Sequence, residues 1–111
     1  LYSKYLDKKY VFFPIEKKYQ YNSYHTFVIQ VNKRDQLKEY LRKNNIMTAI
    51  HYPIPIHLQP AAKVLGYKKG SFKQAENQAR RILTLPINQY LTHAEIKRVS
   101  DKINLFFMKS I

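Results

Sequence analysis

The pattern of apolar and polar positions predicts a strand, a helix and a second strand over residues 27–50. Residues 27–31 (FVIQV) are rich in β-branched side chains and alternate in character, which is typical of a half-buried strand. Asn32 is expected to cap the following helix, and Leu37 lies on its apolar stripe. The pair Asn44-Asn45 is typical of a helix end, and the short apolar run 46–50 indicates the second strand.

A proline-rich loop interrupts the regular pattern after this second strand. Residues 51–60 (HYPIPIHLQP) contain three prolines, and each proline removes a backbone donor and restricts the residue before it. We therefore expect a stiff, irregular loop over this segment. Pro60 suits the first turn of a short helix through Leu65, which Gly66 would close.

Two further helices are predicted in the remainder of the chain. Ser71 with Gln74, and Thr92 with Glu95, have the spacing of capping boxes. The apolar face of the first helix is predicted to extend through Ile82-Leu83. Together, these elements predict an α+β fold with a small three- or four-stranded sheet, antiparallel or mixed, and helices packed on one face.

Length and composition suit one folded domain and exclude several classes of protein. The chain has 111 residues, of which 45% are apolar and 14% aromatic, so a disordered tail is excluded. It contains no cysteine, which excludes disulfides and thiolate metal sites. No apolar run reaches the roughly 18 residues that a membrane span needs, and we expect a cytoplasmic location.

Positive charge is the strongest feature of the composition. Lysine and arginine number 20 against 7 acidic residues, which gives a net charge of +13. Such a surface attracts nucleic acid, anionic lipid or phosphorylated small molecules. Residues 4–24 interleave tyrosines with lysines, as single-strand binders do, although no helix-turn-helix or RNA-binding signature follows. A basic nucleic-acid-binding domain and a structural interaction domain therefore stand as alternatives to a role in an enzyme.

The proline loop contains the candidate functional side chains. A stiff loop at a strand end can hold His51, Tyr52, His57 and Gln59 in fixed directions, and their polar groups suit a polar ligand. The alternative is that both histidines only satisfy backbone groups within the loop. No carboxylate lies near them in the sequence, so we predict no metal site. With only two glycines in the chain, glycine-rich phosphate-binding motifs are excluded.

The order and spacing of several motifs resemble a known enzyme family. The stretch HYPxPxHxQPA covers residues 51–61, with SYHxFVI before it at 23–29 and LGY and LP after it at 65–67 and 85–86. Together these motifs resemble the C-terminal domain of the nucleotide-sugar aminotransferases, the DegT/DnrJ group of pyridoxal-phosphate enzymes. The resemblance covers nearly all of residues 23–107.

The resemblance implies that residues 23–111 are the small C-terminal domain of the aspartate-aminotransferase fold, with residues 1–22 as the end of an interdomain helix and a connector. It implies a longer parent protein, commonly a homodimer, that moves an amino group from glutamate or glutamine to a keto group on a nucleotide-linked sugar. The products would feed surface polysaccharides or modified sugars. Pyridoxal 5'-phosphate would be bound mainly by a large domain that this chain lacks. The chain alone is therefore expected to be inactive and to contain no catalytic residue.

The family's functional positions can be carried over at five residues. His51 and Tyr52 match positions near the substrate entrance, and His57 and Gln59 shape the same turn. His25 matches a strand histidine of the family, adjacent to the site, and its role is left unassigned. These assignments make the proline loop a part of the substrate site.

One departure from the family lies at Asn44-Asn45, where a glycine is common before the following isoleucine. The change is tolerable if an asparagine adopts the left-handed conformation there. The same layout predicts that Leu37, Ile82 and Phe106 belong to the core. An alanine at each of these positions should then cost about 2–5 kcal/mol.

Overall fold

Three antiparallel strands form the sheet of the computed structural model, which describes residues 1–110. The strands are β1 (Val11–Phe12), β2 (Phe27–Val31) and β3 (Ile82–Leu85), and β2 lies between the other two. Val11 pairs with Val31, and Ile29 pairs with Leu83. The predicted α+β fold is confirmed, and of the two predicted arrangements the sheet is antiparallel.

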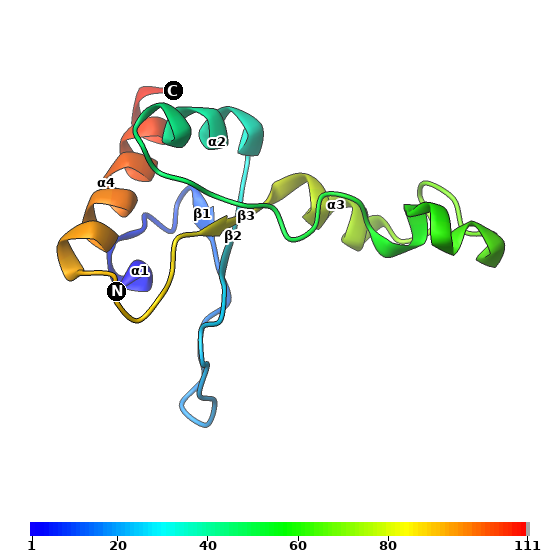
Figure 1. Ribbon diagram of the computed structural model, residues 1–111, viewed down its shortest axis with the longest axis horizontal. Helices are drawn as coiled ribbons and strands as arrows, with labels where there is room; N and C mark the ends of the chain where they lie inside the picture. Colours follow the sequence, from blue (N-terminus) through cyan, green and yellow to red (C-terminus); the bar gives the residue numbers. More distant parts are fainter. Residues whose placement is uncertain (111) are drawn as a thin grey trace.

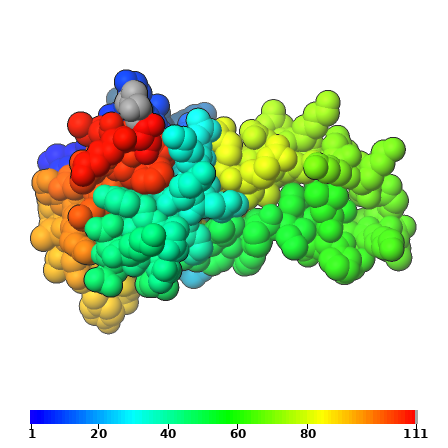
Figure 2. Space-filling view, turned by 90° about the horizontal axis from the view of Figure 1, so that it is seen from above, coloured from blue at the N-terminus to red at the C-terminus, as the bar shows by residue number. Residues whose placement is uncertain are grey.

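The helices divide into two groups, one on the sheet and one projecting from it. The helices are α1 (Tyr2–Tyr5), α2 (Arg34–Lys43), α3 (Lys73–Arg81) and α4 (His93–Lys109), with the 3-10 helices η1 (Ile56–Leu58) and η2 (Pro60–Leu65). Residues of α1, α2 and α4 pack on one face of the sheet, as predicted. Residues 51–81, which include η1, η2 and α3, form an arm that extends from this body (Figures 1 and 2).

The core lies between the sheet and the three helices on its face. Because side chains along β2 alternate between the two faces, Ile29 and Val31 are fully buried while Val28 and Gln30 are only half-buried. The outer strands add the fully buried Val11, Leu83 and Leu85, and the helices contribute Leu37, Leu41 and Ile103. Removal of this apolar surface from water is the main force that holds the body together.

The first residues of the chain belong to the packed body. Tyr2 is buried, and its hydroxyl donates a hydrogen bond of 2.6 Å to the carbonyl oxygen of Pro86. Burial raises the pKa of Tyr2 to about 12, so the phenol keeps its proton and remains a donor. Asn104 of α4 donates to the carbonyl of Tyr5 and accepts from the amide of Asp7. These contacts attach α1 to α4.

One of the two predicted capping boxes forms. The amide of Glu95 donates to the Thr92 hydroxyl at 3.2 Å, and the amide of Thr92 donates to the Glu95 carboxylate at 2.7 Å. The capping box predicted at Ser71 does not form, because the Ser71 hydroxyl accepts a hydrogen bond from the amide of Lys68 instead. α3 therefore begins after Phe72 with no side-chain cap.

The ends of α2 also test the predicted boundaries. Asn32 does not cap this helix: it begins at Arg34, after Lys33 in the left-handed conformation with φ of 54°, and no side chain caps it. The predicted end is confirmed, because Asn44 follows the last residue of the helix and Asn45 has φ of 59°. An asparagine thus takes the left-handed position where the family commonly has glycine.

One helix prediction and one strand prediction are wrong. Ile82-Leu83 lies in β3 and not in a helix, because these residues pair with Gln30 and Ile29 of the central strand. Residues 46–50 do not form a regular strand: only Ala49 pairs, with Thr84 of β3. The carbonyl oxygen of Thr48 accepts a hydrogen bond from the ammonium group of Lys38. A longer strand would need this carbonyl for backbone pairing. The third strand is β1, a segment that the pattern assigned to a connector.

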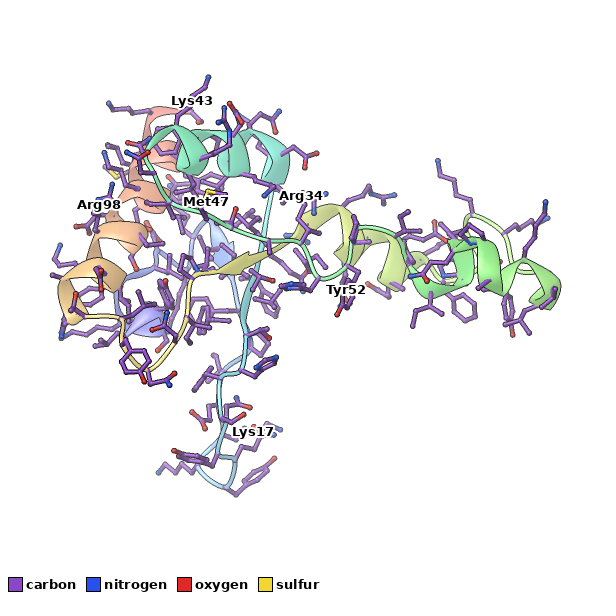
Figure 3. The ribbon with its side chains drawn as sticks, viewed as in Figure 1. Lys17, Arg34, Lys43, Met47, Tyr52 and Arg98 are labelled. Atoms are coloured by element: carbon purple, nitrogen blue, oxygen red, sulfur yellow. The ribbon has the colours of Figure 1, made fainter. Side chains whose placement is uncertain are left out.

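Arg34 joins the arm to the body. Its Nη1 atom donates to the carbonyl oxygen of Ala79 at 3.1 Å and to that of Ile82 at 2.9 Å (Figure 3). The last carbonyls of a helix have no partner within the helix, so an external donor is needed where they are buried. Arg34 supplies this donor at the point where α3 becomes β3.

A long loop of residues 13–26 joins β1 to β2 and projects from the body, with Lys17 near its tip (Figures 1 and 3). Tyr24 in this loop has φ of 51° and donates a hydrogen bond to the carboxylate of Glu16. Within residues 1–110, no helix combines the length and the apolar character that a membrane crossing requires.

Candidate functional site

A groove of about 580 Å³ lies at the base of the arm, and we call it the arm groove. The sheet contributes Val28 and Ile82 to its lining, and the proline loop, η2, the turn after η2 and α3 contribute the rest. His51, Tyr52, His57 and Gln59 all line it. The structure thus brings the four loop residues predicted from the sequence into one cavity.

His51 is held at the edge of β3. Its Nδ1 atom lies 2.9 Å from the Thr84 hydroxyl oxygen, within hydrogen-bond distance. The backbone of Thr84 pairs with Ala49, two residues before His51, so one residue of the sheet fixes both the ring and the chain that leads to it. The ring of Tyr52 meets the ring of His51 edge to face, with centroids 5.4 Å apart.

Tyr52 is highly accessible to solvent. Its side chain is 71% exposed and stands at the base of the arm (Figure 3). Gln59, in contrast, acts within the loop, because its side-chain amide donates to the carbonyl of Ile54 at 3.1 Å. Tyr52 is therefore free to contact a ligand, whereas Gln59 holds the shape of the loop.

His57 is a buried residue with a structural contact. It is 8% exposed, and its Nε2 atom lies 2.9 Å from Oε1 of Glu76 on α3. The same oxygen accepts a 2.7 Å hydrogen bond from the amide of Gly70. Because a carboxylate oxygen only accepts, Nε2 of His57 must carry a proton. The pair joins η1 to α3 within the arm.

The hydrogen bond from His57 lowers the pKa of Glu76, against the opposing effect of burial, and the amide of Gly70 lowers it further. A carboxyl group whose pKa is lower in the folded state stabilises the fold above its unfolded pKa. This contribution is lost as the pH falls through the folded pKa. Glu76 is therefore expected to be ionised at neutral pH. The stability of the arm should fall at acid pH, when this carboxylate takes up a proton.

Replacement of Glu76 by glutamine tests this linkage. The amide cannot ionise, so Glu76→Gln should unfold at lower urea concentration than the wild type at pH 7. The difference between the two should shrink as the pH falls below the ordinary range of a glutamate, because the wild-type carboxylate then takes up a proton. Urea midpoints measured from pH 7 to pH 3 check this, and a constant difference would contradict it.

His25 lies outside the arm groove. It is exposed and lines separate hollows beside the β1–β2 loop, next to Tyr24 and Asn88. The structure does not bring it together with the loop residues. Its role stays unassigned.

Sequence reasoning missed the contact of Thr84 with His51. The only available signal was a hydroxyl residue inside the apolar run ILTL of residues 82–85. Its contact with His51 spans 33 positions of sequence, and it depends on the pairing of β3 with the segment before the proline loop. Periodicity alone does not reveal such a contact.

The positive charge of the chain is not concentrated in the arm groove. No lysine or arginine is among the described residues that line it. The lysines of the arm lie on η2, on the turn after it and at the start of α3: Lys63, Lys68, Lys69 and Lys73. The groove is mainly apolar, and its exposed or half-exposed polar groups are those of His51, Tyr52, Tyr67, Gln59 and Gln78.

Comparison with known proteins identifies the family to which this chain belongs. The model of the DegT/DnrJ/EryC1/StrS aminotransferase family matches residues 1–104. The chain belongs to this family. The aminotransferase-family resemblance of the motifs in residues 23–107 is thus confirmed, and the match also includes the first strand and helix.

Relatives of this chain include both curated proteins and solved structures. The dTDP-3-amino-3,4,6-trideoxy-alpha-D-glucose transaminase of Streptomyces venezuelae is 38% identical over 72% of this chain. The pleiotropic regulatory protein of Geobacillus stearothermophilus is 37% identical over 85% of it. The crystal structure of a DegT DnrJ EryC1 StrS aminotransferase from Brucella abortus superposes with a TM-score of 0.84 and 31% identity, over 95% of this chain and 28% of that one.

The chain corresponds to a small part of these relatives. It spans 21% of the Streptomyces transaminase and 25% of the Geobacillus protein. The fold described above is therefore that of one domain of the family. Activities of the longer relatives belong to proteins about three and a half times its length, because the 80 and 94 aligned residues are 21% and 25% of those two proteins.

Proposed function

We propose that this chain is the substrate-closing lobe of a longer aminotransferase that uses pyridoxal 5'-phosphate. The enzyme would transfer an amino group from glutamate or glutamine to a keto group on a nucleotide-linked sugar. The observation that carries the proposal is the arm groove, because the family's HYPxPxHxQPA loop forms one wall of it. The dTDP-sugar transaminase among the relatives supports the substrate class.

The lobe would bind and orient the sugar nucleotide and exclude water from it. Tyr52 offers an exposed phenol, and His51 offers the ring nitrogen Nε2 that Thr84 does not engage. Apolar side chains such as Ile54 and Ile82 make up most of the remaining wall. Such a wall excludes water when a second lobe closes over it, and hydrogen bonds made there become stronger.

The cofactor does not fit the arm groove. Pyridoxal phosphate needs a lysine for its covalent attachment and an acidic partner for its ring nitrogen. The described lining residues include no lysine, aspartate or glutamate. We infer that a large lobe before residue 1 holds the cofactor, that residues 1–22 include the end of the helix that leads from it, and that the complete enzyme is a homodimer in the cytoplasm.

Exposed apolar side chains on the arm support a two-lobed parent. Ile56, Val64, Leu65 and Phe72 are each well exposed, although side chains of this kind favour burial. A second lobe would cover them. The arm would then reach the lobe that holds the cofactor, while the body of the domain stays clear of it.

The test uses the longest reading frame that contains this chain, together with the 111-residue chain alone. With pyridoxal phosphate and glutamate, the longer protein should show visible absorption from bound cofactor and should release 2-oxoglutarate. The 111-residue chain should do neither. A longer protein that binds no cofactor, or turnover by the short chain alone, would overturn the proposal.

Variants of the longer protein then separate a substrate site from a structural module. His51→Ala and Tyr52→Ala should lower kcat/KM for the sugar nucleotide while the release of 2-oxoglutarate from glutamate continues. His93→Ala is the matched control, because His93 contacts Tyr5 at the far side of the body and does not line the groove. Unchanged turnover in both groove variants would favour a purely structural module.

A further inference from the structure

We propose that Thr84 is a positioning residue that holds the imidazole of His51 and leaves Nε2 as the atom presented to a ligand in the arm groove. This inference rests on the proposed function for the identity of the ligand. The orientation of the ring can be tested without any ligand.

The geometry at Thr84 supports a fixed ring. The hydroxyl oxygen of Thr84 lies 2.9 Å from Nδ1 of His51, and among the described residues this is its one hydrogen-bond partner. Thr84 is buried, and its backbone amide and carbonyl both pair with Ala49 at 2.8 and 3.1 Å. A hydroxyl held this way has little freedom to move, so it defines where the ring nitrogen can lie.

A second contact restricts rotation of the same ring. Tyr52 packs against it edge to face, with an angle of 75° between the two ring planes. The hydroxyl thus fixes one nitrogen, and the tyrosine limits the tilt of the ring. Exposed histidines usually sample several rotamers, so this pair of contacts reduces the entropy that ligand binding would otherwise cost.

The two nitrogens of His51 consequently have different roles. Thr84 donates to Nδ1 or accepts from it, and in either case Nδ1 is engaged. Nε2 makes no hydrogen bond with the described residues, and His51 lines the arm groove. Nε2 is therefore the polar atom of His51 that a hydroxyl or phosphate oxygen of a sugar nucleotide would meet. Because no lysine or arginine is among the described residues that line the groove, such a ligand would depend more on this nitrogen.

Thr84→Val tests the contact, because valine keeps the shape and removes the hydroxyl. The chain offers a matched control in Thr48→Val: the Thr48 hydroxyl is buried and has no hydrogen-bond partner among the described residues. Thr84→Ser keeps a hydroxyl and serves as the rescue variant. Nuclear magnetic resonance of the histidine-labelled 111-residue chain follows the order of the His51 ring and the shifts of Nδ1 and Nε2.

The wild type, Thr48→Val and Thr84→Ser should show an ordered ring with the same Nδ1 shift. Thr84→Val should show a mobile ring and a changed Nδ1 shift. An equally ordered ring in Thr84→Val would overturn the proposal.

Titration with dTDP-glucose as the probe tests the second part. Binding should shift Nε2 of His51 more than Nδ1, and Thr84→Val should weaken binding by about three- to tenfold, the range of one hydrogen bond. In a His51→Ala background, Thr84→Val should add no further loss, because Thr84 acts through the ring. A full additional loss, or a shift confined to Nδ1, would overturn the assignment.

The two proposals fail in different ways. If dTDP-glucose causes no change in the wild type, the proposed substrate class loses its support, and the ring order in Thr84→Val still decides whether Thr84 positions His51. If the probe binds and the ring order does not depend on Thr84, the proposed function stands and the positioning role is wrong.

Discussion

Leu37→Ala is expected to lower the free energy of unfolding by about 2–5 kcal/mol. Leu37 is fully buried between α2 and the sheet, and the shorter side chain removes apolar contacts and leaves a cavity. Because domains are stable by only about 5–15 kcal/mol, the variant should lose a large part of its stability. Urea denaturation at neutral pH measures the change.

Two comparison variants show whether burial is the cause. Val64→Ala changes an aliphatic side chain on the arm that is 91% exposed, so its midpoint should match the wild type. Phe106 is half-buried against the core, so Phe106→Ala should fall between the two. A Leu37→Ala midpoint equal to that of Val64→Ala would contradict the packing of α2.

The structure revises the expectation that Leu37, Ile82 and Phe106 all belong to the core. Leu37 is in the core, as predicted, and Phe106 packs against it from α4. Ile82 is half-buried and lines the arm groove, so its side chain belongs to the site wall rather than to the core. The prediction failed there because it placed Ile82 on a helix, whereas in β3 its side chain faces away from Leu83.

Elements with strong local signals were predicted well. The alternation in residues 27–31 identified β2, and the capping-box spacing of Thr92 and Glu95 identified the start of α4. The short helix from Pro60 is also present, as the 3-10 helix η2 with Gly66 at its end. In each case the residues that determine the structure are neighbours in the sequence.

Elements that depend on distant partners were not predictable in the same way. β1 has only two residues, and it becomes a strand because Val11 and Phe12 pair with the end of β2. β3 follows α3 directly, with no turn residue between Arg81 and Ile82 to mark the change. Pairing with the central strand decides this boundary, and tertiary contacts override local helical preference.

The candidate site also combines features that follow from the local sequence with features that depend on distant partners. The proline loop identified the four groove residues, because a stiff polar loop is conspicuous in the sequence. The different roles of His51 and His57 came only from the structure. One ring faces the groove beside Thr84, and the other is buried against Glu76. The alternative weighed for both histidines was that they only satisfy backbone groups within the loop, whereas the contact of each ring is with a side chain of another element, Thr84 for His51 and Glu76 for His57.

Arg34→Ala is expected to lower the free energy of unfolding by about 2–3 kcal/mol, since hydrogen bonds from a charged donor are stronger than neutral ones. The Arg34 side chain is 10% exposed, and its loss leaves the carbonyls of Ala79 and Ile82 without this donor. The effect should centre on the junction of α3 and β3. Hydrogen exchange of the α3 amides should therefore increase more than that of the α4 amides.

Arg80→Ala is the matched control for this variant, because Arg80 lies in the last turn of α3, the helix end that Arg34 contacts, but is exposed. It should leave both the urea midpoint and the exchange of α3 unchanged. Arg34→Lys keeps the charge but replaces the planar fork with a single ammonium group, so it should recover only part of the loss. If Arg34→Ala and Arg80→Ala behaved alike, the arm would be held by its apolar contacts with the sheet, and the Arg34 hydrogen bonds would contribute little.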